Sequence, residues 1–252
     1  PGTINEKRAL NGLNLKLNEG DFVTVIGGNG AGKSTMLNAV AGTWPVDEGQ
    51  ILIDNIDVTK LSEHKRATYL GRVFQDPMTG TAATMGIEEN LALAKRRGKS
   101  RLLRSGITKA EREEYKELLK ILGLGLEDRL TSKVGLLSGG QRQALTLLMA
   151  TLQKPKLLLL DEHTAALDPK TAAKVLSLTE RIIDRDKLTA LMITHNMRDA
   201  LKYGNRLIMM YNGRILVDVA GEEKKNLTTQ DLLLMFEKAA GNTLDSDRLL
   251  LG

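Results

Sequence analysis

Cysteine is absent from this 252-residue chain. Without thiols the protein can form neither a disulfide bridge nor a thiolate metal site, and the absence is consistent with a reducing cytosol. Long apolar runs are absent too, since no stretch approaches the roughly 18 uncharged apolar residues that a membrane-spanning helix needs. The longest run, Leu157 to Leu160, has the length of a buried strand. We also see no secretory signal, and we therefore expect a globular protein.

Aromatic residues are scarce, at 3% of the chain. The net charge of +5 would suit a nucleic-acid partner, but the aromatic residues are not interleaved with the basic ones. A stacking platform for single strands is therefore not expected, and we do not expect nucleic acid as a partner. Part of the positive charge forms either a solvated loop or a contact for anionic lipid headgroups or an acidic protein surface. The basic residues concerned are Lys95, Arg96, Arg97, Lys99, Arg101 and Arg104.

What the chain does contain is a glycine-rich stretch, GGNGAGKST, between an apolar run at 21–26 and a helical pattern at 34–41. The order of strand, glycine loop and helix fits the pattern G-x-x-x-x-G-K-[ST], whose backbone amides curl round phosphates. In that pattern Lys33 reaches the β- and γ-phosphates and Ser34 ligates Mg²⁺. The helix N-terminus adds a favourable field for the anion. The residues assigned to nucleotide binding here are Gly27, Gly28, Asn29, Gly30, Ala31, Gly32, Lys33, Ser34 and Thr35.

The remaining pattern is that of an interrupted α/β protein. Strands predicted at 10–17, 21–26 and 49–54 suggest an antiparallel β layer beside the nucleotide core. From Met85 the pattern turns helical, with a capping box at Thr108, and strands return at 156–160 and 188–194 around a helix that Asp168 caps. We predict an α/β fold with a P-loop NTPase core, in which a mostly parallel sheet is flanked by helices, with an antiparallel β layer and an inserted helical subdomain. The expected parts are 1–84 (β layer and first part of the core), 85–153 (helical subdomain), 154–241 (second part of the core) and 242–252 (tail).

Phosphoryl transfer asks a protein for positioning and charge stabilisation, so we looked for further oxygen and amide groups at strand ends. Asp161 follows the most apolar strand and can hold Mg²⁺ opposite Ser34. Glu162 could orient or deprotonate the attacking water. Gln75 ends a strand with an amide that can touch both metal and water, and His195 ends another where its imidazole can reach the γ-phosphate.

A second helix start distinguishes between kinds of P-loop protein. The sequence LSGGQ at 137–141 is a capping box, and its two glycines leave a helix N-terminus bare of side chains, able to press against an anion. A second phosphate-binding helix end implies a second grip on ATP. With GGNGAGKST before it and LLLLDE at 157–162 after it, LSGGQ resembles the ATP-binding subunit of ABC transporters, bacterial importers in particular, over essentially the whole chain.

The resemblance implies a role for each motif, with ATP and Mg²⁺ as cofactors. It implies that subunits form a head-to-tail homodimer, in which each ATP lies between Walker A of one copy and the signature of the other, and that closure drives a transmembrane partner. The implied roles are Walker A at 27–35, the Q-loop at Gln75, the signature at Ser138, Gly139, Gly140 and Gln141, the Walker B aspartate at Asp161, the catalytic glutamate at Glu162, the D-loop at Asp168 and the switch histidine at His195. Mg²⁺ is assigned to Ser34, Gln75 and Asp161.

The chain departs from the family pattern at two places. The family usually carries an aromatic residue upstream of Walker A to stack on adenine, whereas no Phe, Tyr or Trp precedes Phe22. Either that residue lay before Pro1, or base recognition is weak. His163 stands where the family commonly has Pro, and we interpret it as a changed turn in preference to a direct catalytic role.

The leading hypothesis is an ATP-hydrolysing subunit that energises solute import, of amino acids or similar small solutes, through a separate membrane permease. This places the protein at the cytoplasmic face of the cell membrane, coupled indirectly to an extracytoplasmic solute-binding protein. Permease contact is expected at about 76–104, next to Gln75. The alternative is a soluble ABC-type ATPase acting on nucleic acid, ribosome or cluster assembly, although we see neither tandem cassettes nor a long coiled-coil insert.

Overall fold

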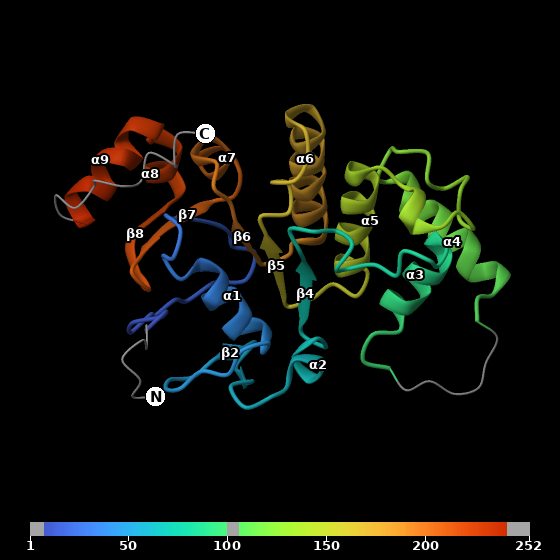
Figure 1. Cartoon of the computed structure of the whole chain (residues 1–252), viewed down its shortest axis with the longest axis horizontal. Helices are drawn as coiled ribbons and strands as arrows, with labels where there is room; N and C mark the ends of the chain where they lie inside the picture. Colours follow the sequence, from blue (N-terminus) through green and yellow to red (C-terminus); the bar gives the residue numbers. More distant parts are fainter. Residues whose placement is uncertain (1–7, 100–105, 241–252) are drawn as a thin grey trace.

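A six-stranded sheet forms the centre of the structure, a computed structural model that describes residues 8–99 and 106–240. The strand order is β4-β5-β6-β1-β7-β8 (Figure 1), and all neighbours are parallel except β8, which is antiparallel to β7. The carboxyl ends of the parallel strands therefore meet at one edge. The strands are β1 (Phe22–Ile26), β4 (Leu70–Val73), β5 (Leu157–Asp161), β6 (Ala190–Ile193), β7 (Arg206–Tyr211) and β8 (Arg214–Ala220).

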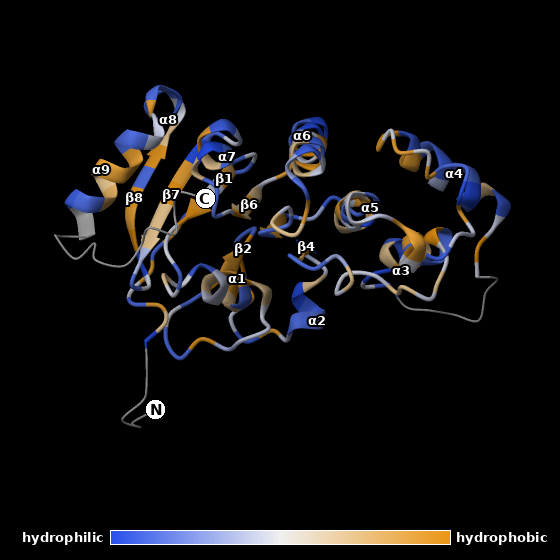
Figure 2. Cartoon of the chain, turned by 45° about the horizontal axis from the view of Figure 1, so that its top comes forward, coloured by the Kyte–Doolittle hydropathy of each residue, from blue (hydrophilic) through white to orange (hydrophobic). Residues whose placement is uncertain are grey.

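Helices cover the sheet and extend it on one side into a helical arm (Figure 1). Hydrophobic colour is concentrated in strands such as β7, whereas the short helices α2 and α8 are hydrophilic (Figure 2). None of the helices in the described ranges is long and apolar enough to cross a membrane. The helices are α1 (Lys33–Ala41), α2 (Glu63–Arg66), α3 (Ile87–Lys95), α4 (Lys109–Lys120), α5 (Gly139–Thr151), α6 (Pro169–Asp186), α7 (Met197–Lys202), α8 (Gly221–Asn226) and α9 (Thr229–Ala240), with a 3₁₀ turn at Val134–Leu136.

The two faces of β5 contact different helices. Leu157 and Leu159 belong to a buried cluster with residues of α1, whereas Leu158 and Leu160 belong to one with residues of α5 and α6. All four leucines are at most 9% exposed. A strand buried on both faces needs a continuous apolar run instead of alternation, and this is why the runs at 156–160 and 188–194 predicted β5 and β6.

The antiparallel layer was predicted wrongly in part. The run at 21–26 became β1, which pairs in parallel with β6 and β7 at the centre of the sheet. The segment 10–17 forms no strand, although its four leucines are all half-buried against the core and alternate with exposed residues at 12, 14 and 16. Only 49–54 contributes to a separate antiparallel pair, formed by β2 (Leu52–Ile53) and β3 (Ile56–Asp57). A segment can therefore show alternating burial without pairing with another strand.

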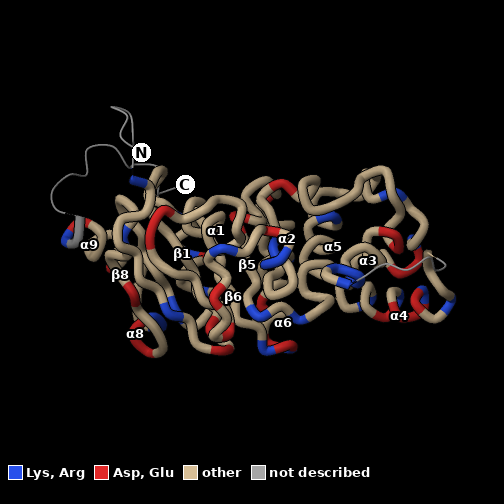
Figure 3. Tube along the Cα trace, turned by 90° about the horizontal axis from the view of Figure 1, so that it is seen from below, with Lys and Arg blue, Asp and Glu red and all other residues tan. Residues whose placement is uncertain are grey.

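The helical arm contains α3, α4 and the start of α5, in agreement with the helical pattern from Met85 onwards. Its residues share one buried cluster with α6 and with β4, β5 and β6, so the arm is continuous with the core of the sheet. Lys95 pairs with Glu114, and Arg96 with Glu111 at 3.1 Å, and charges of both signs are interspersed along α4 (Figure 3). Arg101 and Arg104 lie outside the described residues. The division into 1–84, 85–153, 154–241 and 242–252 stays a prediction.

The structure agrees with the capping and turn residues of the sequence. The Thr108 hydroxyl accepts a bond from the Glu111 amide at 3.2 Å, which confirms the capping box. The two hairpin residues between β7 and β8, Asn212 and Gly213, both have positive φ, at 47° and 74°, as a two-residue hairpin turn requires. For the last helix, the Thr228 hydroxyl caps the Asp231 amide at 3.2 Å.

A buried arginine joins α2 to the end of α1. Arg66 is 2% exposed, and its guanidinium donates to the carbonyl oxygens of Ala39 at 2.6 Å and Val40 at 3.0 Å, in the last turn of α1. It also donates to the carbonyls of Thr59 at 2.8 Å and Leu61 at 2.9 Å. The carbonyls of a last helical turn have no partner within the helix, and a cation there also complements the helix dipole.

We expect Arg66→Met to lower the free energy of unfolding by about 3 kcal/mol, because four carbonyl oxygens, all at least partly buried, lose a charged donor. Urea denaturation followed by circular dichroism measures the change. Lys65→Met, at the exposed neighbouring position on the same helix, is the matched control and should stay within about 0.5 kcal/mol of wild type. Equal stability of the two variants would contradict this role for Arg66.

Candidate functional site

The predicted chemical groups follow adjacent strands at one edge of the sheet. Gln75 follows β4, Asp161 ends β5 and Glu162 follows it, His195 follows β6 and Gly27 follows β1. These four strands are neighbours in the sheet. The register brings their ends level, since Asp161 and Val25 both pair with Ile193. Ligands of open α/β sheets bind at this edge, so the topology gathers groups that are far apart in sequence.

The glycine loop between β1 and α1 has no room for side chains at two positions. Gly27 has φ 150°, and a Cβ there would lie 2.3 Å from the carbonyl oxygen of Met210. Gly32 has φ 100°, and a Cβ there would lie 2.7 Å from the carbonyl oxygen of Ala9. The loop is therefore fitted between the β7–β8 hairpin and the segment near Ala9, and it exposes its other side.

Lys33, the first residue of α1, bends back over this loop. Its side chain is buried, and its Nζ donates to the carbonyl oxygens of Gly27 at 2.5 Å and Gly28 at 3.1 Å. The ammonium group therefore lies at the N-terminal end of α1, where the helix dipole already favours an anion. Ser34, one residue later, is exposed.

A cavity of about 270 Å³ lies in front of the loop. Its lining joins the helix start to the ends of β5 and β6, because Glu162 and His195 both reach it. The lining residues are Ala9, Asn29, Gly30, Ala31, Gly32, Lys33, Ser34, Thr35, Glu162 and His195.

Glu162 and His195 contact each other across neighbouring strand ends. His195 Nε2 lies 2.5 Å from Glu162 Oε1, and the side chains are 41% and 13% exposed. Glu162 has a positive φ of 47°, an uncommon conformation for a residue with a side chain. A carboxylate held in this way by an imidazole can orient a water molecule or accept its proton.

Asp161, beside Glu162, is also largely buried, with 18% of its side chain exposed. Burial raises the pKa of its carboxyl group above the ordinary value, and the Arg72 guanidinium, 3.7 Å away, opposes part of that shift. Arg72 also donates to Asn38 Oδ1 at 2.6 Å and lies over the Phe74 ring at 4.6 Å. Sequence reasoning missed Arg72, although a basic residue within an otherwise apolar strand, LGRVF, was the available signal.

The signature residues lie against α6 and do not line the cavity of the same chain. The Ser138 hydroxyl accepts from the Gln141 amide at 3.3 Å, and the Gln141 side chain accepts from the Ser138 amide at 3.1 Å, so the capping box is confirmed. A Cβ at Gly139 would lie 3.2 Å from Leu167 Cδ2, and one at Gly140 would lie 2.3 Å from Thr171 Cγ2. The tip of α5 therefore packs on the start of α6 without an intervening side chain.

Five other predicted residues are also outside the cavity lining, namely Gly27, Gly28, Asp161, Asp168 and Gln75. The Asp168 carboxylate caps α6 by accepting from the Thr171 amide at 3.1 Å, and hydrogen bonds from the Thr171 side chain and amide lower the pKa of Asp168. Gln75 is exposed, and Gln143 of α5 donates to the carbonyl oxygen of Phe74, directly before it, at 3.2 Å.

His163 is 2% exposed, and its Nε2 lies 3.0 Å from Thr179 Oγ1 of α6. Burial lowers the pKa of its imidazole to about 4, so the ring is neutral at physiological pH. This burial and the absence of His163 from the cavity lining favour the interpretation of a changed turn.

Three comparisons with known proteins describe the same chain. The family model described as ABC transporter matches residues 10–165. The chain is 46% identical over 239 residues to a tyrosine transport ATP-binding protein of Clostridioides difficile, covering 95% of this chain and 93% of that protein. It is 37% identical over 212 residues to the methionine import ATP-binding protein MetN of Rhizobium etli, covering 82% of this chain and 56% of that protein.

Solved structures confirm the predicted fold class. An ATP-binding cassette solved as a dimer in a post-hydrolysis state with ADP and Pi has a TM-score of 0.73 at 32% identity, covering 87% of this chain and 94% of that one. An ATP-binding cassette of an ABC transporter in its ADP conformation has a TM-score of 0.75 at 28% identity, covering 93% of this chain and 94% of that one.

Proposed function

The chain belongs to the ABC transporter family of ATP-binding proteins, and from this premise we propose that it hydrolyses ATP to energise solute import through a separate membrane permease. The observation that carries the proposal is the 2.5 Å contact between Glu162 and His195 in the cavity that the glycine loop also lines. It supplies a base beside an anion-binding helix end, which is what hydrolysis of a triphosphate requires.

ATP would bind with its phosphates against the loop 27–35. The backbone amides and the N-terminus of α1 favour the anion, and Lys33 is placed to contact the β- and γ-phosphates. Glu162 would then orient and deprotonate the attacking water, while His195 holds the carboxylate and contacts the γ-phosphate. These roles rest on the cavity lining and on the strand-end positions of the residues.

The residues present fit Mg²⁺. Ser34 offers an exposed hydroxyl at the start of α1, and Asp161 and Gln75 offer carboxylate and amide oxygens at neighbouring strand ends, which are the hard oxygen ligands that Mg²⁺ prefers. When bound, the ion would neutralise charge that develops on the phosphates. Ser34, Gln75 and Asp161 would hold it.

The signature residues would act on a second copy of the chain. Ser138, Gly139, Gly140 and Gln141 do not line the cavity of their own chain, and Asp168 does not line it either. The start of α5 is exposed at Ser138 and Gly139, and a helix N-terminus favours an anion. A head-to-tail homodimer would place this helix start over the partner's ATP, and the dimeric form of the related cassette supports this arrangement.

The permease would contact the segment that follows Gln75, within 76–99 of the described residues. Met78 and Leu93 are large apolar side chains exposed there at 42% and 36%. The named relatives are ATP-binding proteins of tyrosine transport and methionine import, so we place the solute among amino acids or similar small molecules. The protein would then lie at the cytoplasmic face of the membrane, with a solute-binding protein as an indirect partner.

Purification of the tagged chain from its own membranes in mild detergent tests this proposal. We expect a multi-span membrane protein to co-purify in stoichiometric amount and to stimulate ATP hydrolysis when both are reconstituted. Recovery with ribosomes or nucleic acid, and no membrane protein, would contradict transport and favour the alternative of a soluble ABC-type ATPase.

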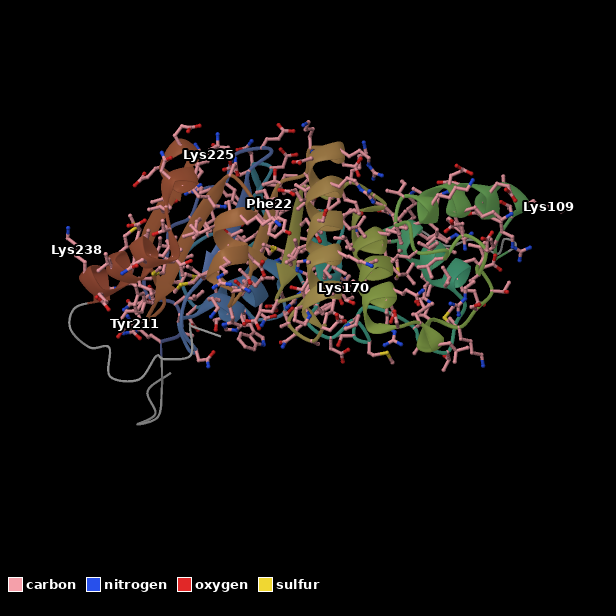
Figure 4. The ribbon with its side chains drawn as sticks, turned by 90° about the horizontal axis from the view of Figure 1, so that it is seen from above. Phe22, Lys109, Lys170, Tyr211, Lys225 and Lys238 are labelled. Atoms are coloured by element: carbon pink, nitrogen blue, oxygen red, sulfur yellow. The ribbon has the colours of Figure 1, made fainter. Side chains whose placement is uncertain are left out.

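Lys33→Ala should weaken ATP binding by about 10- to 100-fold, because a phosphate-contacting cation is lost. Titration with a fluorescent ATP analogue measures the affinity. Lys109→Ala is the matched control, since Lys109 is also the first residue of a helix but lies in the helical arm (Figure 4). Unchanged affinity in Lys33→Ala would refute the phosphate-binding role of the loop.

A further inference from the structure

We infer that His163 is a positioning residue for Glu162, acting through its buried contact with Thr179 of α6. The inference rests on the proposed function, in which Glu162 activates the attacking water. His163 itself does not line the cavity, so its effect would pass through the backbone that it shares with Glu162.

Glu162 needs external support because its backbone is strained. Its φ of 47° lies in the left-handed region, which costs a residue with a side chain of order 1 kcal/mol or more. Such a conformation persists only where the surroundings determine it. The conformation matters here because it turns the carboxylate towards His195 at the end of the neighbouring strand.

The support comes from both sides of Glu162. On the strand side, its amide donates to the carbonyl oxygen of Ile193 at 3.1 Å, which prolongs the pairing of β5 with β6. On the other side, His163 is 2% exposed and contacts Thr179 at 3.0 Å. The strained residue is thus held between the sheet and α6.

The direction of the His163–Thr179 bond follows from the hydroxyl. Thr179 Oγ1 donates its single proton to the carbonyl oxygen of Val175 at 2.9 Å. Towards His163 it can therefore only accept, so Nε2 carries the proton and donates it. The bond requires a donor at residue 163 and an acceptor at residue 179. Each of these two groups can be removed by a separate substitution.

The same helix also holds the far end of the loop. The Ala165 amide donates to the carbonyl of Glu162 at 2.9 Å, and Asp168 then caps α6 through Thr171. Without the His163 bond, residues 162–167 would keep one attachment to α6, at its first turn, and would lose the one beside Glu162. A displacement of about 1 Å at a reacting group can lower the rate 10²-fold. We therefore expect loss of the His163 bond to slow hydrolysis by displacing the Glu162 carboxylate.

The test compares Thr179→Val, which keeps the shape of the side chain and removes the acceptor, with Thr179→Ser, which keeps the hydroxyl. We expect Thr179→Val to lower kcat about 10-fold or more with the KM for ATP within about twofold of wild type, and Thr179→Ser to restore kcat. His163→Leu should behave like Thr179→Val, and the double variant should be no slower than either single one.

The matched control is Thr151→Val, because Thr151 is also a buried helical threonine whose hydroxyl bonds the carbonyl four residues earlier, at 3.0 Å. A kcat unchanged in Thr179→Val, an equal loss in Thr151→Val, or a parallel loss of ATP affinity would overturn the inference. Glu162→Gln in the same assay keeps the two proposals distinct. If Glu162→Gln abolishes hydrolysis and Thr179→Val hydrolyses ATP at the wild-type rate, only the positioning role of His163 is contradicted. If the wild-type protein does not hydrolyse ATP, both the proposed function and the role of His163 are contradicted.

Discussion

Glu162→Gln is expected to slow ATP hydrolysis by at least about 100-fold while ATP still binds. The amide keeps the size of the side chain and can still bond His195, but it cannot take a proton from water. Because the bound nucleotide then persists, the variant should accumulate as an ATP-bound dimer. Phosphate release measures the rate, and size-exclusion chromatography with ATP measures the dimer.

Glu237→Gln, an equivalent change at an exposed position of α9, is the control for this experiment and should hydrolyse ATP like wild type. Hydrolysis at the wild-type rate in Glu162→Gln would remove this residue from the reaction. Slow hydrolysis without a dimer would leave the role of the base in place and count against two copies closing on ATP.

A mixture of Ser138→Arg and Lys33→Ala proteins is expected to recover activity that neither variant has alone. In a head-to-tail heterodimer one site would combine the intact loop of the first variant with the intact signature of the second, and the other site would carry both defects. Random mixing makes half of the dimers heterodimers, each with one intact site of two, so about a quarter of wild-type activity should return.

The control for the mixture is the double variant with both substitutions in one chain, which should not recover activity when mixed with either single variant. Activity of Ser138→Arg alone at the wild-type level would show that the signature does not contact ATP. A mixture no more active than its components would contradict sharing of sites between copies.

Local patterns predicted the parts of the site that depend on neighbouring residues. The glycine loop, the Ser138 capping box and the Asp168 cap each follow from side chains within a few positions of one another. The strand-end positions of Asp161 and His195 also followed from sequence, because continuous apolar runs precede them and parallel strands place their carboxyl ends together.

The features that were missed depend on contacts between distant residues. The apolar pattern of 21–26 would suit a strand of an antiparallel layer as well as a central strand of a parallel sheet. Only the pairing of this run with β6 and β7 shows that it is a central strand. Arg72 gains its importance from Asp161, 89 positions along the chain, and His163 from Thr179 on α6. No pattern within one segment reports such pairs.

The close packing of Gly140 on Thr171 bears on how sequence variation in this family is interpreted. A Cβ at Gly140 would lie 2.3 Å from the Thr171 methyl group, so even an alanine there requires the Thr171 side chain to move. Positions 140 and 171 should therefore covary, with a larger residue at the first tolerated only beside a smaller one at the second. Part of the selection on the signature sequence would then act on its packing against α6 of the same chain.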